Sequence, residues 1–120
     1  MMRLANKVGL VTAAGSGMGR AGVIRFAKEG AKVAVVDLDK DAVDAAVAEI
    51  EAAGGEALGI ACDLRDDDNA RRIVKETATR FGGLDFVWNH VGHPGPAAIE
   101  GIDMADYELA MDLNLSLIHI

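Results

Sequence analysis

The stretch that decides the fold is TAAGSGMG at residues 12–19, a glycine-rich segment that follows an apolar run ending at Val11. A segment of helical character comes next, and a second apolar run over residues 32–36 leads into Asp37. Gly17 and Asp37 lie about 20 residues apart, as in dinucleotide-binding units built from a strand, a glycine turn, a helix, a strand and an acid. A bare glycine-rich turn is a weak signal, but this context predicts that the region binds a nicotinamide dinucleotide.

Each part of this pattern has a physical role in holding a dinucleotide. Glycines allow a tight turn and let a pyrophosphate approach the backbone. The free N–H groups at the start of the following helix then face the phosphates. The carboxylate of Asp37 can accept hydrogen bonds from both hydroxyls of an adenosine ribose. The cofactor contacts expected from this region come from Thr12, Gly15, Ser16, Gly17, Met18, Gly19, Asp37 and Leu38.

The composition excludes several classes of partner. The chain has 120 residues, 51% of them hydrophobic, and a formal net charge of −7 from 19 acids and 12 bases. An acidic surface repels nucleic acid and anionic membranes, so we expect neither as a partner. The single cysteine, Cys62, cannot form an internal disulfide, which fits a reducing compartment. No apolar run approaches the roughly 20 residues of a membrane helix. We therefore expect a cytoplasmic protein.

Four short apolar runs, separated by helical patterns, predict the fold class. We expect strands over about residues 7–12, 32–37, 56–62 and 84–89, and most of these runs are apolar throughout, as in strands covered on both faces. Helices are expected over 17–29, 40–53 and 67–82, with a last helix beginning near Asp103. This alternation predicts an α/β fold, a Rossmann-like doubly wound parallel sheet with right-handed crossovers.

A run of three acids precedes the third expected helix. Asp66 is a plausible N-cap, and Gly82 with Gly83 is expected to end that helix. Carboxylates at a helix start are favourable without a bound cation. We therefore interpret the run at residues 66–68 as a solvated cap, and no metal site is expected in the chain.

Together these residues resemble the short-chain dehydrogenase/reductase family, whose glycine turn is usually written T-G-x-x-x-G-x-G. Ala13 replaces the first glycine here, and we expect its methyl group to fit with a negative φ. The family has an Asp after the third strand that contacts the adenine amine. Asp63 stands at that position, and the resemblance implies that Leu64 lies beside the adenine ring.

The resemblance also implies site residues after the fourth strand. The family's N-N-A-G motif reads N-H-V-G at residues 89–92, so Asn89 and Gly92 match while His90 does not. We assign all three to the cofactor site, with Asn89 as a support and His90 next to the expected cofactor ribose. Another histidine, His93, is interpreted as a surface or packing residue.

The resemblance implies only one catalytic residue in this chain. Asn114 matches the Asn of the family's catalytic tetrad, which positions a water in the proton relay. The Ser and the Tyr-x-x-x-Lys of the tetrad are expected beyond residue 120. Tyr107 is not that tyrosine, because Met111 stands where the lysine is required. The tail at residues 116–120 carries no family signature.

The resemblance covers residues 6–115 and corresponds to about the first half of a family member. It implies one partial NAD(P)-binding Rossmann domain, residues 1–120, that ends after about four strands and five helices or fewer. This would be the cofactor-binding part of an oxidoreductase that moves a hydride between a nicotinamide and a small alcohol or carbonyl substrate. We expect the chain to be inactive alone and the full-length protein to be a homo-oligomer.

The expected cofactor is NAD, with NADP less favoured. Asp37 would repel a 2′-phosphate, and neither Ser16 nor Leu38 is replaced by an Arg or Lys that could bind one. Two other classes remain open. The first is a dinucleotide-binding sensor or regulatory module without chemistry. The second is a methyltransferase, which ranks low because that class usually lacks the pattern of Asp63 and Asn89-x-x-Gly92.

Overall fold

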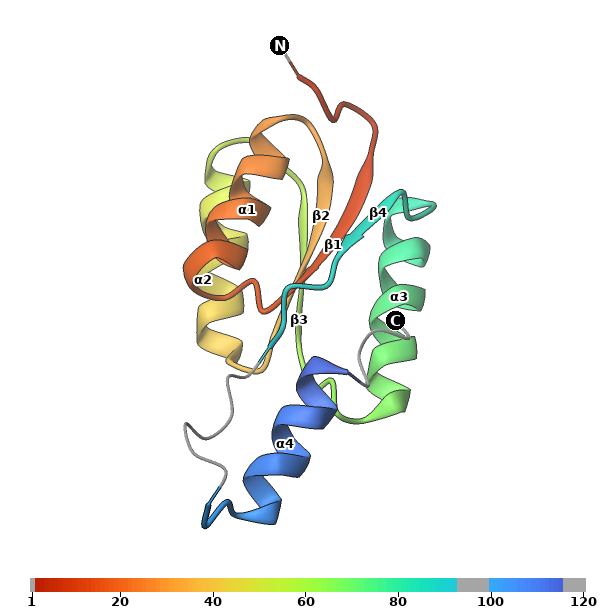
Figure 1. Ribbon diagram of the computed structural model, residues 1–120. Coiled ribbons are helices and arrows are strands. Elements are labelled where there is room, and N and C mark those ends of the chain that lie inside the picture. The colour runs from red at the N-terminus through yellow and green to blue at the C-terminus, as the bar shows by residue number, and fades with distance from the viewer. Residues whose placement is uncertain (1, 93–99, 116–120) are drawn as a thin grey trace.

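Strands and helices alternate along the chain in a computed structural model, which describes residues 2–92 and 100–115 (Figure 1). The strands are β1 (Val8–Thr12), β2 (Lys32–Asp37), β3 (Ala57–Ala61) and β4 (Phe86–Trp88). The helices are α1 (Gly17–Lys28), α2 (Lys40–Ala52), α3 (Asp67–Phe81) and α4 (Met104–Asn114). The predicted α/β alternation is confirmed. His93 and the tail at 116–120 lie outside the described residues.

The four strands form one parallel sheet in the order β3-β2-β1-β4. β1 pairs along its whole length with β2, from Val8 opposite Lys32 to Thr12 opposite Val36. On its other side β1 pairs with β4. The chain thus builds outward from β1 in one direction and then reverses. In open parallel sheets, ligands bind outside the carboxyl ends of the strands at such a reversal, here the end of β1.

Helices cover both faces of the sheet, so the doubly wound prediction is confirmed. Figure 1 shows α1 and α2 on one side and α3 on the other. Because side chains alternate along a strand, Val33 and Val35 of β2 pack toward α1 and α2. Ala34 and Val36 belong to the second cluster, which contains Ile73 of α3. Full burial of one such aliphatic side chain contributes about 1.5–3 kcal/mol.

Close contact between α1 and β4 depends on a glycine. A Cβ added at Gly22 of α1 would lie 2.2 Å from the Trp88 ring, so the helix and the strand approach over a bare backbone. Phe26 packs edge to face against both Phe86 and Trp88, with ring centroids 5.2 and 6.0 Å apart. This aromatic group sets the position of α1, and with it the position of the glycine turn.

Aspartates begin three of the helices. Asp39, Asp66 and Asp103 each accept a hydrogen bond from a backbone N–H in the first turn of α2, α3 and α4. The predicted cap at Asp66 and the predicted start of the last helix near Asp103 are confirmed. Gly82 ends α3 in the left-handed conformation, with φ 83°, which glycine adopts without a steric penalty.

β4 is shorter than the run at 84–89 predicts. The Asp85 carboxylate accepts a hydrogen bond from the backbone N–H of Val8, with a distance of 2.8 Å from N to Oδ2. The side chain therefore replaces the carbonyl acceptor of the Val8 N–H, while the Asp85 N–H still donates to the Val8 carbonyl at 2.8 Å. Among the helices of residues 2–92 and 100–115, none has the length and hydropathy needed to cross a bilayer.

Candidate functional site

The glycine turn after β1 requires glycine at three positions for three different reasons. A Cβ at Gly15 would lie 2.9 Å from the Asp37 carboxylate, and a Cβ at Gly19 would lie 2.2 Å from the Ala13 carbonyl oxygen. Gly17 has a φ of 56°, and a Cβ built there meets no atom within 4 Å in the described chain. The surface at Gly17 is therefore open, while Gly15 and Gly19 allow close packing beneath it.

Ala13 has a positive φ of 52°, so the expectation of a negative φ is wrong. The next residue, Ala14, donates its N–H to the Val36 carbonyl at 3.0 Å, which ties the turn to β2. The chain must bend sharply between the buried end of β1 and this bond, and the left-handed conformation provides the bend. Such a conformation costs an L-residue about 1–2 kcal/mol. The family's glycine at this position would avoid that cost.

The start of α1 differs from the starts of the other described helices. Its N-cap, Ser16, makes no side-chain capping bond, and its first turn contains no acidic residue. The orphan N–H groups of that turn thus meet no side-chain oxygen from the cap, and the helix dipole there is positive. Met18, in this turn, is 71% exposed. A helix start of this kind suits an anionic ligand.

The Asp37 carboxylate at the end of β2 is oriented by two backbone donors. Its Oδ2 accepts from the Gly15 N–H at 2.9 Å, and its Oδ1 accepts from the Asp39 N–H at 3.2 Å. An ionised carboxylate has about four acceptor positions, so the side chain retains capacity for two further donors. Leu38 follows and is 70% exposed.

A pocket of about 420 Å³ lies beside Asp37, outside the carboxyl ends of the strands. It brings together four residues that the sequence predicted for the site, Asp37, Leu38, Asp63 and Leu64. Six further residues line it: Ala13, Cys62, Arg65, Val91, Leu109 and Leu113. Sequence reasoning did not assign these six. The two leucines lie one turn apart on α4, a spacing that marks a shared helix face, but only the fold shows which pocket that face closes.

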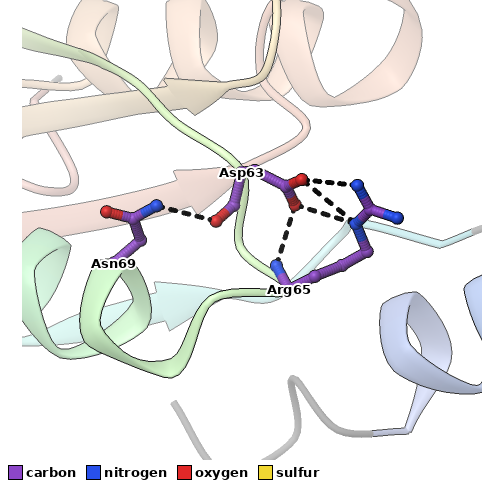
Figure 2. Close-up of polar contacts among 3 residues, drawn as sticks. All are labelled: Asp63, Arg65 and Asn69. Carbon is purple, nitrogen blue, oxygen red and sulfur yellow. Dashed lines mark hydrogen bonds and ion pairs between the residues drawn. The ribbon is translucent and has the colours of Figure 1, made fainter.

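Asp63 and Arg65 form an ion pair at the wall of this pocket (Figure 2). Asp63 Oδ1 accepts from the backbone N–H of Arg65 at 3.0 Å and from its Nε at 3.1 Å. Asp63 Oδ2 accepts from the same Nε at 3.1 Å and from an Nη at 2.7 Å. These hydrogen bonds to Arg65 hold the pKa of the Asp63 carboxyl below its ordinary value. Burial raises the pKa of the neighbouring Cys62 thiol.

Thr12 links β1 to the segment after β4. Its hydroxyl donates to Asn89 Oδ1 and accepts from the Val91 N–H, both at 3.1 Å. Thr12 is fully buried, so its hydroxyl acts within the protein rather than at a surface. Thr12 and Asn89 therefore fix the position of Val91 in the pocket wall.

His90 lies behind the glycine turn and outside the pocket lining. Its ring packs against Trp88, with centroids 4.8 Å apart. Its Nδ1 atom is buried without a hydrogen-bond partner in the described part of the chain. That atom lies 2.9 Å from where a Cβ of Gly19 would stand. A side chain at residue 19 would therefore collide with His90 as well as with the turn itself.

Asn114, at the end of α4, lies next to the segment after β4. A Cβ at Gly92 would stand 3.1 Å from Asn114 Oδ1. The structure thus brings the predicted catalytic residue close to the last residue of the N-H-V-G motif. Both are exposed.

Comparison with known proteins agrees with this architecture. A family model described as short chain dehydrogenase matches residues 7–118. A 2,5-dichloro-2,5-cyclohexadiene-1,4-diol dehydrogenase of Sphingobium indicum is 44% identical over 103 residues, which is 84% of this chain and 41% of the relative. The chain spans about half the length of the curated relatives it matches.

Two solved structures share the fold and were determined with a nicotinamide dinucleotide. One is a 7α-hydroxysteroid dehydrogenase complexed with NADH and 7-oxo glycochenodeoxycholic acid, with TM-score 0.92 and 32% identity over 98% of this chain and 46% of that one. The other is an NAD⁺-bound xylitol dehydrogenase, with TM-score 0.91 and 29% identity over 98% of this chain and 45% of that one. Because the family model matches nearly the whole length of this chain, the chain belongs to the short-chain dehydrogenase family.

Proposed function

We propose that residues 1–120 are the NAD-binding part of an oxidoreductase that acts on a small alcohol or carbonyl compound. The observation that carries the proposal is the pocket that joins Asp37 and Leu38 to Asp63 and Leu64 beside an open, uncapped helix start. Apolar walls with a few carboxylates suit an adenosine, and the helix start suits a pyrophosphate. The adenosine and the pyrophosphate of a dinucleotide thus each have a matching surface, the adenosine in the pocket and the pyrophosphate at the helix start.

The residues have distinct roles in this proposal. Leu38, Leu64 and Val91 provide apolar contact for the adenine ring. Asp63 accepts a hydrogen bond from the adenine amine, and Asp37 accepts from the ribose hydroxyls.

The pyrophosphate would meet the helix start and its exposed residues. Ser16, Gly17 and Met18 contact the pyrophosphate, because they form the exposed start of α1. Gly15, Gly19 and Thr12 shape the turn from beneath. Asn89, His90 and Gly92 support the ribose that carries the nicotinamide.

NAD is the proposed cofactor because of the charge at the end of β2. A 2′-phosphate on the adenosine ribose would stand next to the Asp37 carboxylate and be repelled. When bound, NAD supplies a carbon that accepts or donates a hydride. The two similar solved structures with a dinucleotide hold NADH and NAD⁺.

Asn114 is the proposed catalytic-site residue of this chain, in the role of holding a water. General acid–base work requires a group of suitable pKa at the reacting oxygen. We propose that the Ser and the Tyr-x-x-x-Lys of the family lie in sequence that follows residue 120. The relatives' names contain a diol and a hydroxysteroid dehydrogenase, so the proposed substrate class is a small alcohol or ketone. We propose homo-oligomeric assembly for the whole protein.

The test is a titration of the protein encoded by the complete reading frame with NADH and NADPH, followed by nicotinamide fluorescence. We expect saturable NADH binding that is tighter than NADPH binding. Asp37→Ala should weaken NADH binding, while Asp41→Ala, at an exposed acid in the first turn of α2, should not. If neither NADH nor NADPH binds, the proposal is refuted. Binding without turnover on a panel of alcohols and ketones would favour the sensor class instead.

A further inference from the structure

Arg65 already engages both oxygens of the Asp63 carboxylate. Three Arg65 hydrogens reach the two oxygens: the backbone N–H, the single Nε hydrogen, which both oxygens share, and one Nη hydrogen. An ionised carboxylate offers about four lone-pair positions. Figure 2 shows dashed lines from Arg65 to both oxygens of the Asp63 carboxylate.

This arrangement conflicts with the role that Asp63 has in the proposed function, on which the inference rests. The amino group of adenine needs an acceptor on Asp63, and both oxygens are already bonded to Arg65. We propose that Arg65 sets the affinity of the adenine subsite by competing with adenine for Asp63. The guanidinium leaves at least one carboxylate oxygen when an adenine nucleotide binds.

The pair has the properties of a contact that can open. The side chains of Arg65 and Asp63 are 47% and 37% exposed, and ion pairs between exposed groups are weak. The carboxylate's own segment is held independently, because Asn69 Nδ2 donates to the Asp63 carbonyl oxygen at 3.0 Å. Release of the guanidinium therefore requires no movement of the chain around Asp63.

A second carboxylate can receive the released charge. Asp112 on α4 also interacts favourably with the Arg65 guanidinium. α4 also supplies Leu109 and Leu113 to the lining of the pocket. Asp112 thus provides a second carboxylate that attracts the guanidinium when adenine displaces it from Asp63.

The experiment measures adenosine, which carries no charge, so that attraction between Arg65 and a pyrophosphate does not enter. Adenosine binding is measured by displacement of NADH from the protein encoded by the complete reading frame. The variants are Arg65→Met, which removes the charge, and Arg65→Lys. The lysine variant keeps the positive charge but lacks the planar guanidinium that bonds both carboxylate oxygens. Arg71→Met is the matched control, because Arg71 pairs with Asp68 at 3.4 Å and does not line the pocket.

We expect Arg65→Met to bind adenosine about two- to fivefold more tightly than the wild type, which is the range for loss of an exposed ion pair. Arg65→Lys should lie between them, and Arg71→Met should match the wild type. Raising the salt from about 0.05 to about 0.5 M should tighten adenosine binding to the wild type, because salt weakens the internal pair. The same change should leave Arg65→Met nearly unaffected.

Unchanged or weaker adenosine binding by both Arg65 variants would overturn the inference, and weaker binding would indicate that the guanidinium stacks on the base. In the Asp63→Ala background the Arg65→Met effect should vanish, and its persistence would also overturn the inference. A wild type that binds neither NADH nor adenosine refutes the proposed function and the inference together. A wild type that binds NADH normally, with Arg65 variants that match it, refutes the inference alone.

Discussion

The Asp37 carboxylate combines a structural role with a proposed role in ligand binding. Its two oxygens already hold the Gly15 and Asp39 N–H groups. The same carboxylate is proposed to accept from a ribose and to repel a 2′-phosphate. Structural and ligand roles therefore share one side chain, and a substitution there changes both. Leu38 is different, because its side chain is 70% exposed. A larger polar side chain can replace it without burying a charge.

The first prediction at this scale concerns cofactor choice. Asp37→Ala combined with Leu38→Arg removes the repulsion and adds a guanidinium that can bind a 2′-phosphate. We expect the ratio of the Kd for NADP to the Kd for NAD to fall by at least about tenfold, equivalent to about 1.4 kcal/mol. Titration with both cofactors measures it, with Leu38→Arg alone as the control. A wild type that prefers NADP would contradict the argument.

The second prediction concerns the Asp63 carboxyl. Arg65 lowers its pKa in the folded protein, so the pair stabilises the fold above the ordinary carboxyl pKa, about 3.9. That contribution is lost as the pH falls through the lowered value. In Arg65→Met the pKa of Asp63 should rise toward the ordinary range. Carbon-detected NMR titration of the carboxyl measures both values, and equal pKa values in the two proteins would show that Arg65 does not hold the charge.

At the scale of elements, α1 is set apart by how it begins. The other described helices start with an aspartate whose side chain caps the first turn, whereas Ser16 leaves the first turn of α1 without such a cap. A missing cap costs a helix about 1 kcal/mol. The cost is consistent with a helix start kept open for an anion, which would satisfy the same N–H groups.

The third prediction compares two glycines that have the same backbone requirement. Gly17 and Gly54 have φ values of 56° and 87°, and an added Cβ meets no atom within 4 Å at either position. Valine at either should cost comparable stability, about 1–2 kcal/mol. Only Gly17→Val should abolish NAD binding, because its side chain would occupy the proposed pyrophosphate site.

Urea unfolding and NADH titration of both variants provide the measurement, and the far-UV spectrum should be largely retained. Wild-type NADH affinity in both the Gly17→Val and the Gly54→Val variant would contradict the assignment of the pyrophosphate site to this turn. Equal loss of affinity in both would assign the effect to stability alone.

At the scale of the whole molecule, two apolar features of the described surface lie apart from the exposed Met18 and Leu38 of the proposed cofactor site. The first is a stripe along α4, where the exposed fractions range from 37% to 61% at Met104, Tyr107, Met111 and Leu115. These residues follow helical spacing and form one face. The second is β4, which stands at the edge of the four-stranded sheet and exposes Val87 by 40%. Contiguous apolar surface of this kind indicates contact with other protein.

The fourth prediction follows from that surface. The 120-residue chain alone should self-associate or unfold over a broad range, because an exposed strand edge pairs with other chains. Several uncovered apolar side chains, at about 1.5–3 kcal/mol each when buried, are large against a typical domain stability of roughly 5–15 kcal/mol. Size-exclusion chromatography and thermal melting test this. A sharp monomeric transition that does not depend on concentration would show that the half-sheet is stable alone.

The fifth prediction concerns activity. The 120-residue chain should not oxidise or reduce any alcohol or carbonyl compound with NAD. Asn114 can hold a water but cannot exchange a proton at neutral pH, so we expect the acid–base group of the reaction to come from residues outside this chain. A spectrophotometric assay of NADH formation and consumption, with chain purified to remove host dehydrogenases, measures turnover. Activity that persists through successive purification steps would contradict the assignment of acid–base work to residues outside this chain.

The sequence by itself determined the class of the fold and the location of the glycine turn. Both depend on local properties. Apolar runs such as 32–36 and caps such as Asp66 act on neighbouring residues, and a glycine turn between a strand and a helix has few other uses. The family resemblance added Asp63, Leu64 and Asn114, which no local rule distinguishes from other acids, leucines and asparagines.

Only the tertiary structure decided how these parts meet. Ala13 takes a positive φ because Ala14 must reach the Val36 carbonyl on a neighbouring strand. Arg65 joins the pocket because the segment after β3 ends beside α4, some 40 residues away along the chain. Arg65 and Asp63 lie only two residues apart in the sequence. The proposed competition between Arg65 and adenine nevertheless depends on a pocket assembled from four strand ends and a helix. Contacts of that kind arise from the order and register of the strands, which no single stretch of sequence contains.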